Sequence, residues 1–436
     1  MSETLAIRGG TPVVPKDLHR HWPVITEADK AAVLAVLDTG IVSGPYAPQV
    51  KALEEEWARY CDVRYALTTN SGTAALHTAV AAGRIGTGDQ VITTAFTFLA
   101  TALAVLQNNA VPVFVDIDPR TYNIDPARIA ERITLRTKAI IPVHIHGVPA
   151  DMDPIRAIAK QHGLLVIEDA AQAHGSTYKG KKVGGIGDMG IFSFQASKNL
   201  PAGEGGIFVT NREDLKDRAN MFRMFGEDIR ESDKTAFDPA RPLDGAREYN
   251  SLTMGWMYRT NELTAALCRS QLRRLDHSLA NTRGNAAYLT EHLGKIPGIS
   301  PPFIPPDCTS SFYQYRIRLN PKAAGSDLSP GAFRRQVLAA LKAEGVEVSL
   351  WQTVPVPGQT LFQDRTGYGM SCPWKCPLGE EVKYDLAEYP ETLKLLEDSM
   401  VVGSHSHPLF PQPLTLMQAY IEAFQRVFAN LDQVLV

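Results

Sequence analysis

Cysteine is scarce in this 436-residue chain. The five cysteines are odd in number and scattered, which excludes a disulfide-rich scaffold and favours a reducing compartment, the cytoplasm. Two of them, Cys372 and Cys376, are close enough in sequence to suggest a metal pair. Because two cysteines without two further ligands nearby are weak evidence for a metal site, we expect none. The five are Cys61, Cys268, Cys308, Cys372 and Cys376.

The chain also lacks a marked excess of charge and any long apolar stretch. Its formal net charge of −3 gives no reason to expect a nucleic acid or a membrane surface as partner. No run of about 18 apolar residues occurs, so we expect no transmembrane helix. Residues 1–5 show no basic segment followed by an apolar one, so we expect no signal peptide.

Between residues 65 and 210, short apolar runs alternate with helical patterns. Seven such runs with helices between them predict an α/β domain whose mainly parallel, seven-stranded sheet is covered by helices on both faces. Ligands of such sheets bind at the carboxyl ends of the strands, where Asn70, Asp169 and Ser193 fall. The predicted strands are 65–69, 90–94, 111–117, 139–143, 164–169, 190–194 and 206–210.

The chain is long enough for two domains, and its pattern changes after residue 265. We expect an irregular N-terminal arm (1–25), a large cofactor-binding domain (26–265) that opens with a capped helix at Thr26, and a smaller α+β domain (266–436). In the small domain we predict a long linking helix over 267–279, a strand over 315–319 and a helix over 330–345. Two polar stretches remain: 227–247, and 347–388, which is long enough to be a functional insertion.

Two residues at predicted strand ends carry the clearest chemical signal. Lys198 follows the run 190–194, and Asp169 ends the run 164–169. A lysine amine condenses with an aldehyde, and a carboxylate can hold a pyridine nitrogen protonated. These are the two protein groups that pyridoxal phosphate (PLP) chemistry needs. Taken singly, such a lysine is usually a solvated surface residue, and such an aspartate usually caps a helix.

Further motifs stand at the ends of the other strands. At 69–76 a strand ends, a glycine permits a turn and a helix begins, so free N–H groups and hydroxyls there can hold a phosphate. In 95–101 an aromatic ring can stack on a flat cofactor or be an ordinary core residue. Gln172, shortly after Asp169, can hydrogen-bond a ring hydroxyl. The phosphate turn, aromatic, Asp169 and Lys198 occur in the order that one PLP site requires.

On these motifs the chain resembles the DegT/StrS family of PLP-dependent sugar and cyclitol aminotransferases. The resemblance runs from about residue 9 to 267 and continues more weakly to the C-terminus. It is carried by 43–45, 70–76, 96–101, 168–175, 193–198 and 203–206. It implies a type I aminotransferase fold and a homodimer with active sites at the subunit interface. It also assigns Lys198 to the covalent link with PLP, Asp169 to the pyridine nitrogen, Phe98 to the ring face, Gln172 to the ring hydroxyl, and Gly72, Thr73 and Ser193 to the phosphate.

The chain departs from the family's pattern at two positions. Met257 stands where the family usually has an asparagine that crosses the dimer to the partner's phosphate, and a thioether cannot donate that hydrogen bond. Tyr313 stands where a histidine is often found. His144 and His146, at the end of a predicted strand, either reach the acceptor or are structural.

The expected activity is amino transfer from glutamate or glutamine to a ketone on a sugar or cyclitol, in amino-sugar, aminoglycoside or other secondary-metabolite biosynthesis. The arm at 9–12 and the segment 351–389 look more similar to those of the family's cyclitol and aminoglycoside-type members than to those of its nucleotide-sugar members, so the resemblance implies a cyclitol acceptor. A dehydratase of the same fold is one alternative, but it carries histidine where this chain has Lys198. The others are a dehydrating and aromatising enzyme of the aminohydroxybenzoate-forming type and a non-catalytic PLP-binding regulator.

Overall fold

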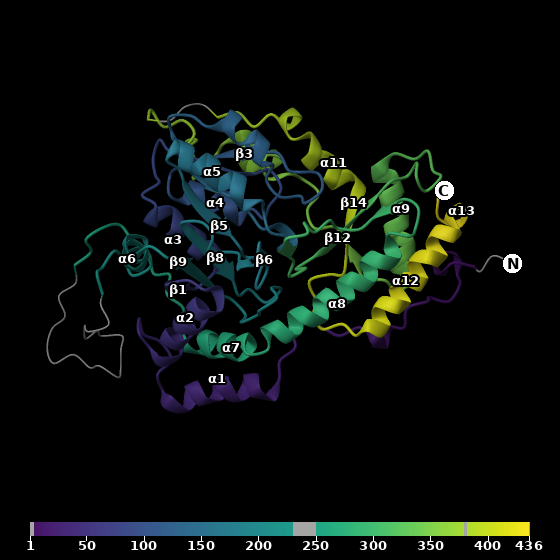
Figure 1. The fold of residues 1–436 in the computed structure, drawn as a ribbon, viewed down its shortest axis with the longest axis horizontal. Coiled ribbons are helices and arrows are strands. Elements are labelled where there is room, and N and C mark those ends of the chain that lie inside the picture. Colours follow the sequence, from purple (N-terminus) through teal and green to yellow (C-terminus); the bar gives the residue numbers. More distant parts are fainter. Residues whose placement is uncertain (1–3, 230–249, 379–381, 436) are drawn as a thin grey trace.

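The computed structural model describes residues 4–229, 250–378 and 382–435, and its two larger sheets each pack against their own helices (Figure 1). The larger sheet has the strand order β1-β9-β8-β5-β4-β2-β3, in which β9 runs antiparallel to both of its neighbours. The predicted mainly parallel, seven-stranded sheet is thus confirmed. Its strands are β1 (Tyr65–Thr69), β2 (Gln90–Thr94), β3 (Val111–Val115), β4 (Thr137–Ile141), β5 (Leu165–Asp169), β8 (Met189–Ser193) and β9 (Gly206–Thr210).

Successive residues of these strands enter two different cores, as the period of two along a strand requires. On β5, Val166 packs into the core beneath one face of the sheet and Ile167 into the core on the other. The first face is covered by α2 (Pro48–Cys61), α5 (Met152–His162) and α7 (Glu262–Leu272), and the second by α3 (Gly72–Ala82), α4 (Ala100–Gln107) and α6 (Glu213–Phe222).

The strand ends differ from the predictions by small shifts. The run predicted as 139–143 is paired as 137–141, because Thr137 extends the ladder opposite Gln90 although its side chain is polar. At the other end Pro142 has no N–H to continue a ladder. The run predicted as 111–117 ends as a strand at Val115.

The prediction of one long helix over 267–279 is wrong. Two helices, α7 and α8 (Leu275–Leu293), meet at a break where Arg274 leaves helical geometry with φ −113° and ψ 4°. The break lets the Arg274 guanidinium reach the carbonyl of Val24 and the carboxylate of Asp29, each at 2.8 Å. Asp29 belongs to α1 (Glu27–Thr39), whose predicted N-cap, Thr26, is confirmed. The predicted domain division at 265/266 falls inside α7 and stays a proposal.

The smaller sheet has the order β10-β12-β14-β13, and Figure 1 shows α8 and α12 running side by side across it. Its strands are β10 (Ile299–Ser300), β12 (Tyr315–Leu319), β13 (Val348–Ser349) and β14 (Ser399–Val402), and its further helices are α9 (Pro330–Ala343), α12 (Leu414–Ala429) and α13 (Leu431–Val434). Leu5 and Val14 of the N-terminal arm join this core. The arm, with short helices η1 (Ala6–Arg8) and η2 (Lys16–Leu18), therefore lies at the small domain, beside α12 and α13 (Figure 1).

The predicted insertion packs back onto the large domain. Phe362, on α10 (Thr360–Asp364), meets Phe114 of β3 edge to face at 5.3 Å, and the Tyr384 hydroxyl donates to the carbonyl of Pro112 at 2.9 Å. The segment also contains η6 (Val356–Gly358) and η7 (Leu386–Glu388) and leads into α11 (Pro390–Asp398). Residues 379–381 of it, and most of the polar stretch 227–247, lie outside the described residues.

A third, small sheet has the order β11-β6-β7 and joins Cys308–Thr309 to the hairpin Thr177–Tyr178 and Lys181–Lys182. No helix in the described ranges is long and apolar enough to cross a bilayer.

Candidate active site

The seven residues predicted to form the site all line one cavity of about 610 Å³. The cavity lies where β5 and β8 end and α3 begins, at the carboxyl edge of the large sheet. The structure therefore brings together residues from four separate motifs of the sequence. The seven are Gly72, Thr73, Phe98, Asp169, Gln172, Ser193 and Lys198.

The start of α3 forms one corner of this cavity. The Ser71 hydroxyl caps the helix by accepting a hydrogen bond from the Ala74 N–H at 3.0 Å. The N–H groups of Gly72 and Thr73 come before the first helical hydrogen bond, and N–H groups in this position attract anions. A Cβ on Gly72 would lie 2.7 Å from the Cβ of Ser193. Glycine at this position therefore lets Ser193 approach the start of the helix.

Asp169 is a buried carboxylate in the wall of the cavity, with 5% of its surface exposed. Its Oδ2 accepts from the Thr101 hydroxyl at 2.7 Å, and its Oδ1 accepts from the Ala171 N–H at 3.1 Å. Burial raises the pKa of Asp169, although the Thr101 hydrogen bond opposes the shift. Because neither hydrogen-bond partner is a cation, the carboxylate is suited to a positively charged nitrogen in the cavity.

Gln172 also lines the cavity, and hydrogen bonds from residues outside the cavity fix its position. Its Oε1 accepts from the backbone N–H of His146 at 2.8 Å, and its backbone carbonyl accepts from the Ser311 hydroxyl at 2.9 Å. With Oε1 held in this way, the amide nitrogen is the part that can donate to a ligand oxygen.

Lys198 lies in the turn after β8, and hydrogen bonds fix its backbone on both sides. Its N–H donates to the carbonyl of Gln195 at 2.8 Å, and its carbonyl accepts from the indole N–H of Trp22 at 3.2 Å. The Lys198 Nζ lies 4.3 Å from the centre of the Tyr313 ring, a distance typical of a cation–π contact. The Tyr313 hydroxyl and the Ser197 hydroxyl are 3.0 Å apart.

The two aromatic residues of the motif at 95–101 have different surroundings. Phe98 lines the cavity and is 56% exposed, so its ring is available to a flat ligand. Phe96 is fully buried and packs edge to face against His146 and Trp351, at 5.7 and 5.4 Å. Phe96 is thus a core residue.

Neither histidine at the end of β4 lines the cavity, and both are buried. His144 Nδ1 accepts from the Ala150 N–H and its Nε2 donates to Glu168, each at 3.0 Å. His146 Nε2 accepts from the Arg316 guanidinium at 3.0 Å, and burial, helped by that cation, holds the pKa of His146 well below its usual value. Of the two interpretations left open by the sequence, the structural one fits both residues.

The two departures from the family's pattern lie in different places. Met257 lies beside Asn70. The backbone N–H of Asn70 donates to the carbonyl of Tyr258, the residue after Met257, at 2.7 Å. The Met257 side chain is 41% exposed and is not among the residues that line the cavity. Tyr313 does line the cavity, with its ring against Lys198.

Several residues at this site were not identified from the sequence. Thr101 lay within a recognised motif, but its hydrogen bond to Asp169 depends on how α4 meets β5. Trp22, Trp351 and His405 line the cavity from the arm, the insertion and the loop after β14. Those segments reach the site through tertiary packing, and no local pattern marks them.

The residues present fit PLP. A helix start with free N–H groups suits a phosphate, the buried Asp169 suits a pyridinium, and the Lys198 amine suits an aldehyde. Over the parts of the chain that the structure describes, no three His, Cys, Asp or Glu side chains are grouped as metal ligands would be.

The sequence model of the DegT/DnrJ/EryC1/StrS aminotransferase family matches residues 23–400. The chain is 34% identical to the L-glutamine:2-deoxy-scyllo-inosose aminotransferase of Micromonospora echinospora, over 98% of both chains. It is 37% identical to the GDP-perosamine synthase of Caulobacter vibrioides, over 74% of this chain and 81% of that one. The solved structure of a 3-amino-5-hydroxybenzoic acid synthase matches with a TM-score of 0.79 and 28% identity, over 94% of this chain and 98% of that one.

Proposed function

The chain is an aminotransferase that belongs to the DegT/DnrJ/EryC1/StrS family, and we propose that it transfers an amino group from L-glutamine to a ring ketone of a cyclitol, with PLP as cofactor. The observation that carries this proposal is the single cavity lined by Lys198, Asp169 and the start of α3. The full-length similarity to an L-glutamine:2-deoxy-scyllo-inosose aminotransferase supports the donor and the acceptor. The similarity to a GDP-perosamine synthase makes a nucleotide-linked sugar the alternative acceptor.

Bound PLP supplies an aldehyde for amine exchange and a ring that withdraws electrons from the substrate's Cα. In our proposal Phe98 covers the face of that ring and Asp169 keeps its nitrogen protonated. A cation against Asp169 lowers the pKa that burial has raised, so the pair favours the charged form of both groups. The proposed ligands of the phosphate are Gly72, Thr73 and Ser193, and that of the ring hydroxyl is Gln172.

Lys198 is the group placed to move protons. As a neutral amine, its Nζ takes a proton from the Cα of the donor as general base and then, as general acid, gives that proton to the cofactor carbon that carried the aldehyde. The hydrogen bonds from Trp22 and to Gln195 fix the backbone from which the lysine side chain moves. The Tyr313 ring, 4.3 Å from Nζ, limits the positions that the amine can take.

We further propose that two copies of the chain form a homodimer. Four apolar side chains lie exposed in one short segment next to Asn70, which follows the strand that leads to the phosphate corner. A cluster of exposed apolar side chains is typical of a surface that another protein covers. They are Leu252, Met254, Trp256 and Met257.

We also propose that the protein functions in the cytoplasm. Its five cysteines form no disulfide bonds, as is usual for proteins of that reducing compartment.

The test is the first half-reaction on purified PLP-loaded protein, with glutamine, glutamate and alanine added separately. Glutamine should remove the visible absorbance of the lysine-bound cofactor within the dead time of manual mixing, and Lys198→Ala should abolish the reaction. If no donor changes the absorbance although PLP is bound, the aminotransferase assignment is wrong. The dehydrating and aromatising reaction, favoured by the similarity to a 3-amino-5-hydroxybenzoic acid synthase, would then be the next to test.

A further inference from the structure

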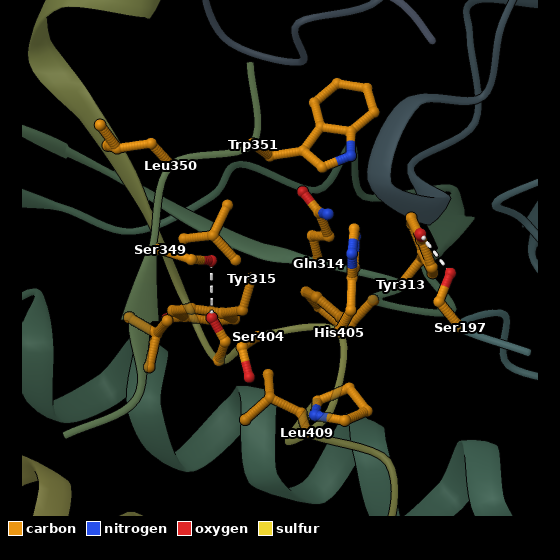
Figure 2. Close-up of a pocket in the computed structure, with 15 residues that line it drawn as sticks. Ser197, Tyr313, Gln314, Tyr315, Ser349, Leu350, Trp351, Ser404, His405 and Leu409 are labelled. Carbon is orange, nitrogen blue, oxygen red and sulfur yellow. Dashed lines mark hydrogen bonds between the residues drawn. The ribbon is translucent and has the colours of Figure 1, made fainter. Parts of the chain in front are cut away.

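A smaller recess of about 210 Å³ adjoins the cofactor cavity on the side of the small domain (Figure 2). It is formed by the segment that leads into β12, by β13 and by β14 with the loop that follows it. The recess and the cofactor cavity share four lining residues, Ser197, Tyr313, Trp351 and His405. A substrate that reacts at Lys198 can therefore extend past Tyr313 into the recess.

The lining of the recess mixes polar and apolar side chains and carries no fixed charge. None of its 15 residues is a lysine, an arginine, an aspartate or a glutamate. The one imidazole among these residues belongs to His405. Partial burial lowers the pKa of His405, and the positive charge of nearby Lys198 lowers it further. At neutral pH the recess therefore presents amide, hydroxyl, indole and phenol groups, with no cation to balance a negatively charged ligand.

Gln314 is the polar residue of the recess that is most in need of a partner. It is 9% exposed, and its Oε1 is buried without a hydrogen bond to any described residue. Gln314 lies just before β12, and Figure 2 shows its side chain pointing toward Trp351. By contrast, the Ser349 hydroxyl in the same recess already donates to the carbonyl of Gly403 at 2.8 Å. A buried amide oxygen without a donor costs free energy unless a ligand supplies the donor.

We infer that this recess binds the side-chain carboxamide of the amino donor, L-glutamine, and that Gln314 recognises it through an amide–amide pair. The inference rests on the proposed function, since the donor must react at Lys198. A carboxamide donates an N–H and accepts at its oxygen, so it matches the two halves of the Gln314 amide whichever way that amide is turned. The two hydrogen bonds would satisfy a group that the chain leaves unsatisfied.

The same recess disfavours L-glutamate as donor. The side-chain carboxylate of glutamate would lose its hydration and find no lysine or arginine among the lining residues. Burying an unpaired carboxylate costs far more than burying an amide. Gln314 and the uncharged lining therefore select for glutamine at the point where glutamine and glutamate differ.

The experiment is the donor half-reaction of the PLP-loaded enzyme by stopped-flow absorbance, with glutamine, glutamate and alanine as substrates. Gln314→Leu should raise the half-saturating glutamine concentration about 10-fold, equivalent to about 1.4 kcal/mol, because both hydrogen bonds are lost. The values for alanine and glutamate should change less than about twofold. Gln161→Leu makes the same chemical change on the exposed face of α5 and should leave all three donors unchanged.

Two outcomes separate this inference from the proposed function. If the wild-type enzyme reacts with glutamine but Gln314→Leu leaves the glutamine value unchanged, or weakens glutamine and alanine equally, the assignment of Gln314 is overturned while the aminotransferase stands. If no donor reacts with the wild-type enzyme, the proposed function fails and this inference fails with it. Unchanged absorbance of the lysine-bound cofactor in Gln314→Leu will show that the site is intact.

Discussion

Two neighbouring carboxylates on β5 have opposite surroundings. Glu168 is fully buried and accepts hydrogen bonds from His144 and from the backbone N–H groups of Gly184, Ile186 and Gly187, at 2.6–3.0 Å. Asp169, one residue later, has two hydrogen-bond partners and a pKa that burial raises. The first carboxylate stabilises the fold, and the second is left for a ligand.

This contrast predicts that Asp169→Asn stabilises the cofactor-free protein. The folded-state pKa of Asp169 lies above its unfolded value, so the favourable contribution is present at acid pH and is lost as pH rises through the folded pKa. At pH 7 the charge is therefore a cost. Removing it should raise the free energy of unfolding by about 1–3 kcal/mol, the range for relieving an incompletely paired buried polar group.

The melting temperature of the cofactor-free protein, measured from about pH 4 to about pH 8, tests how this stabilisation depends on pH. The stabilisation by Asp169→Asn should be largest at the alkaline end and shrink toward the acid end. Asp327→Asn, at an exposed loop position, is the matched control and should melt like the parent. If Asp169→Asn melts at a lower temperature than the parent at neutral pH, groups of the protein already stabilise the Asp169 carboxylate and the prediction is wrong.

At this scale the sequence identified the residues whose type and position at a strand end are both informative, such as Asp169 and Lys198. It could not identify Trp22, because the indole meets the Lys198 carbonyl across 176 positions of chain. It also could not decide between two roles for His144, because the tautomer depends on the Ala150 N–H and on Glu168.

Among the elements, the strands were predicted well because buried parallel strands are continuous apolar runs. The α7–α8 break was missed, since Arg273 and Arg274 are good helix formers and only the tertiary contacts of Arg274 with Val24 and Asp29 favour the break. The insertion was recognised by composition, but composition says nothing about the β3 surface on which Phe362 packs.

The insertion should depend on Phe362 for its attachment. This ring is fully buried among Phe114, Trp374 and Tyr384. Phe362→Ala should lower the free energy of unfolding by about 3–5 kcal/mol, or release the segment locally. In the second case limited trypsin digestion should cut at Arg365 well before the rest of the chain.

The control for this digestion is Phe303→Ala, because Phe303 is 37% exposed and lies outside the cluster. It should leave both the melting temperature and the cleavage rate close to those of the parent. Equal behaviour of the two variants would show that the insertion is held by other contacts.

For the whole molecule, the proposed homodimer predicts a mass in solution of twice 47.7 kDa. Light scattering after size exclusion measures it directly. Met254→Glu places a charge on a side chain that is 76% exposed within the proposed interface, and it should shift the mass toward that of one chain. Leu135→Glu, at a fully exposed leucine just before β4, should not. A monomeric parent would contradict the proposal.

The N-terminal arm has a consequence for how the protein is made. The Leu5 N–H donates to Gln433 at 3.1 Å, the Trp22 N–H donates to the carbonyl of Ser406 at 2.8 Å, and the Trp22 indole then fixes Lys198. The arm thus finds a partner 428 positions later in the sequence. A nascent chain can therefore form the large sheet before the loop that carries Lys198 gains all its supports, because Ser406, which binds Trp22, is synthesised long after that sheet.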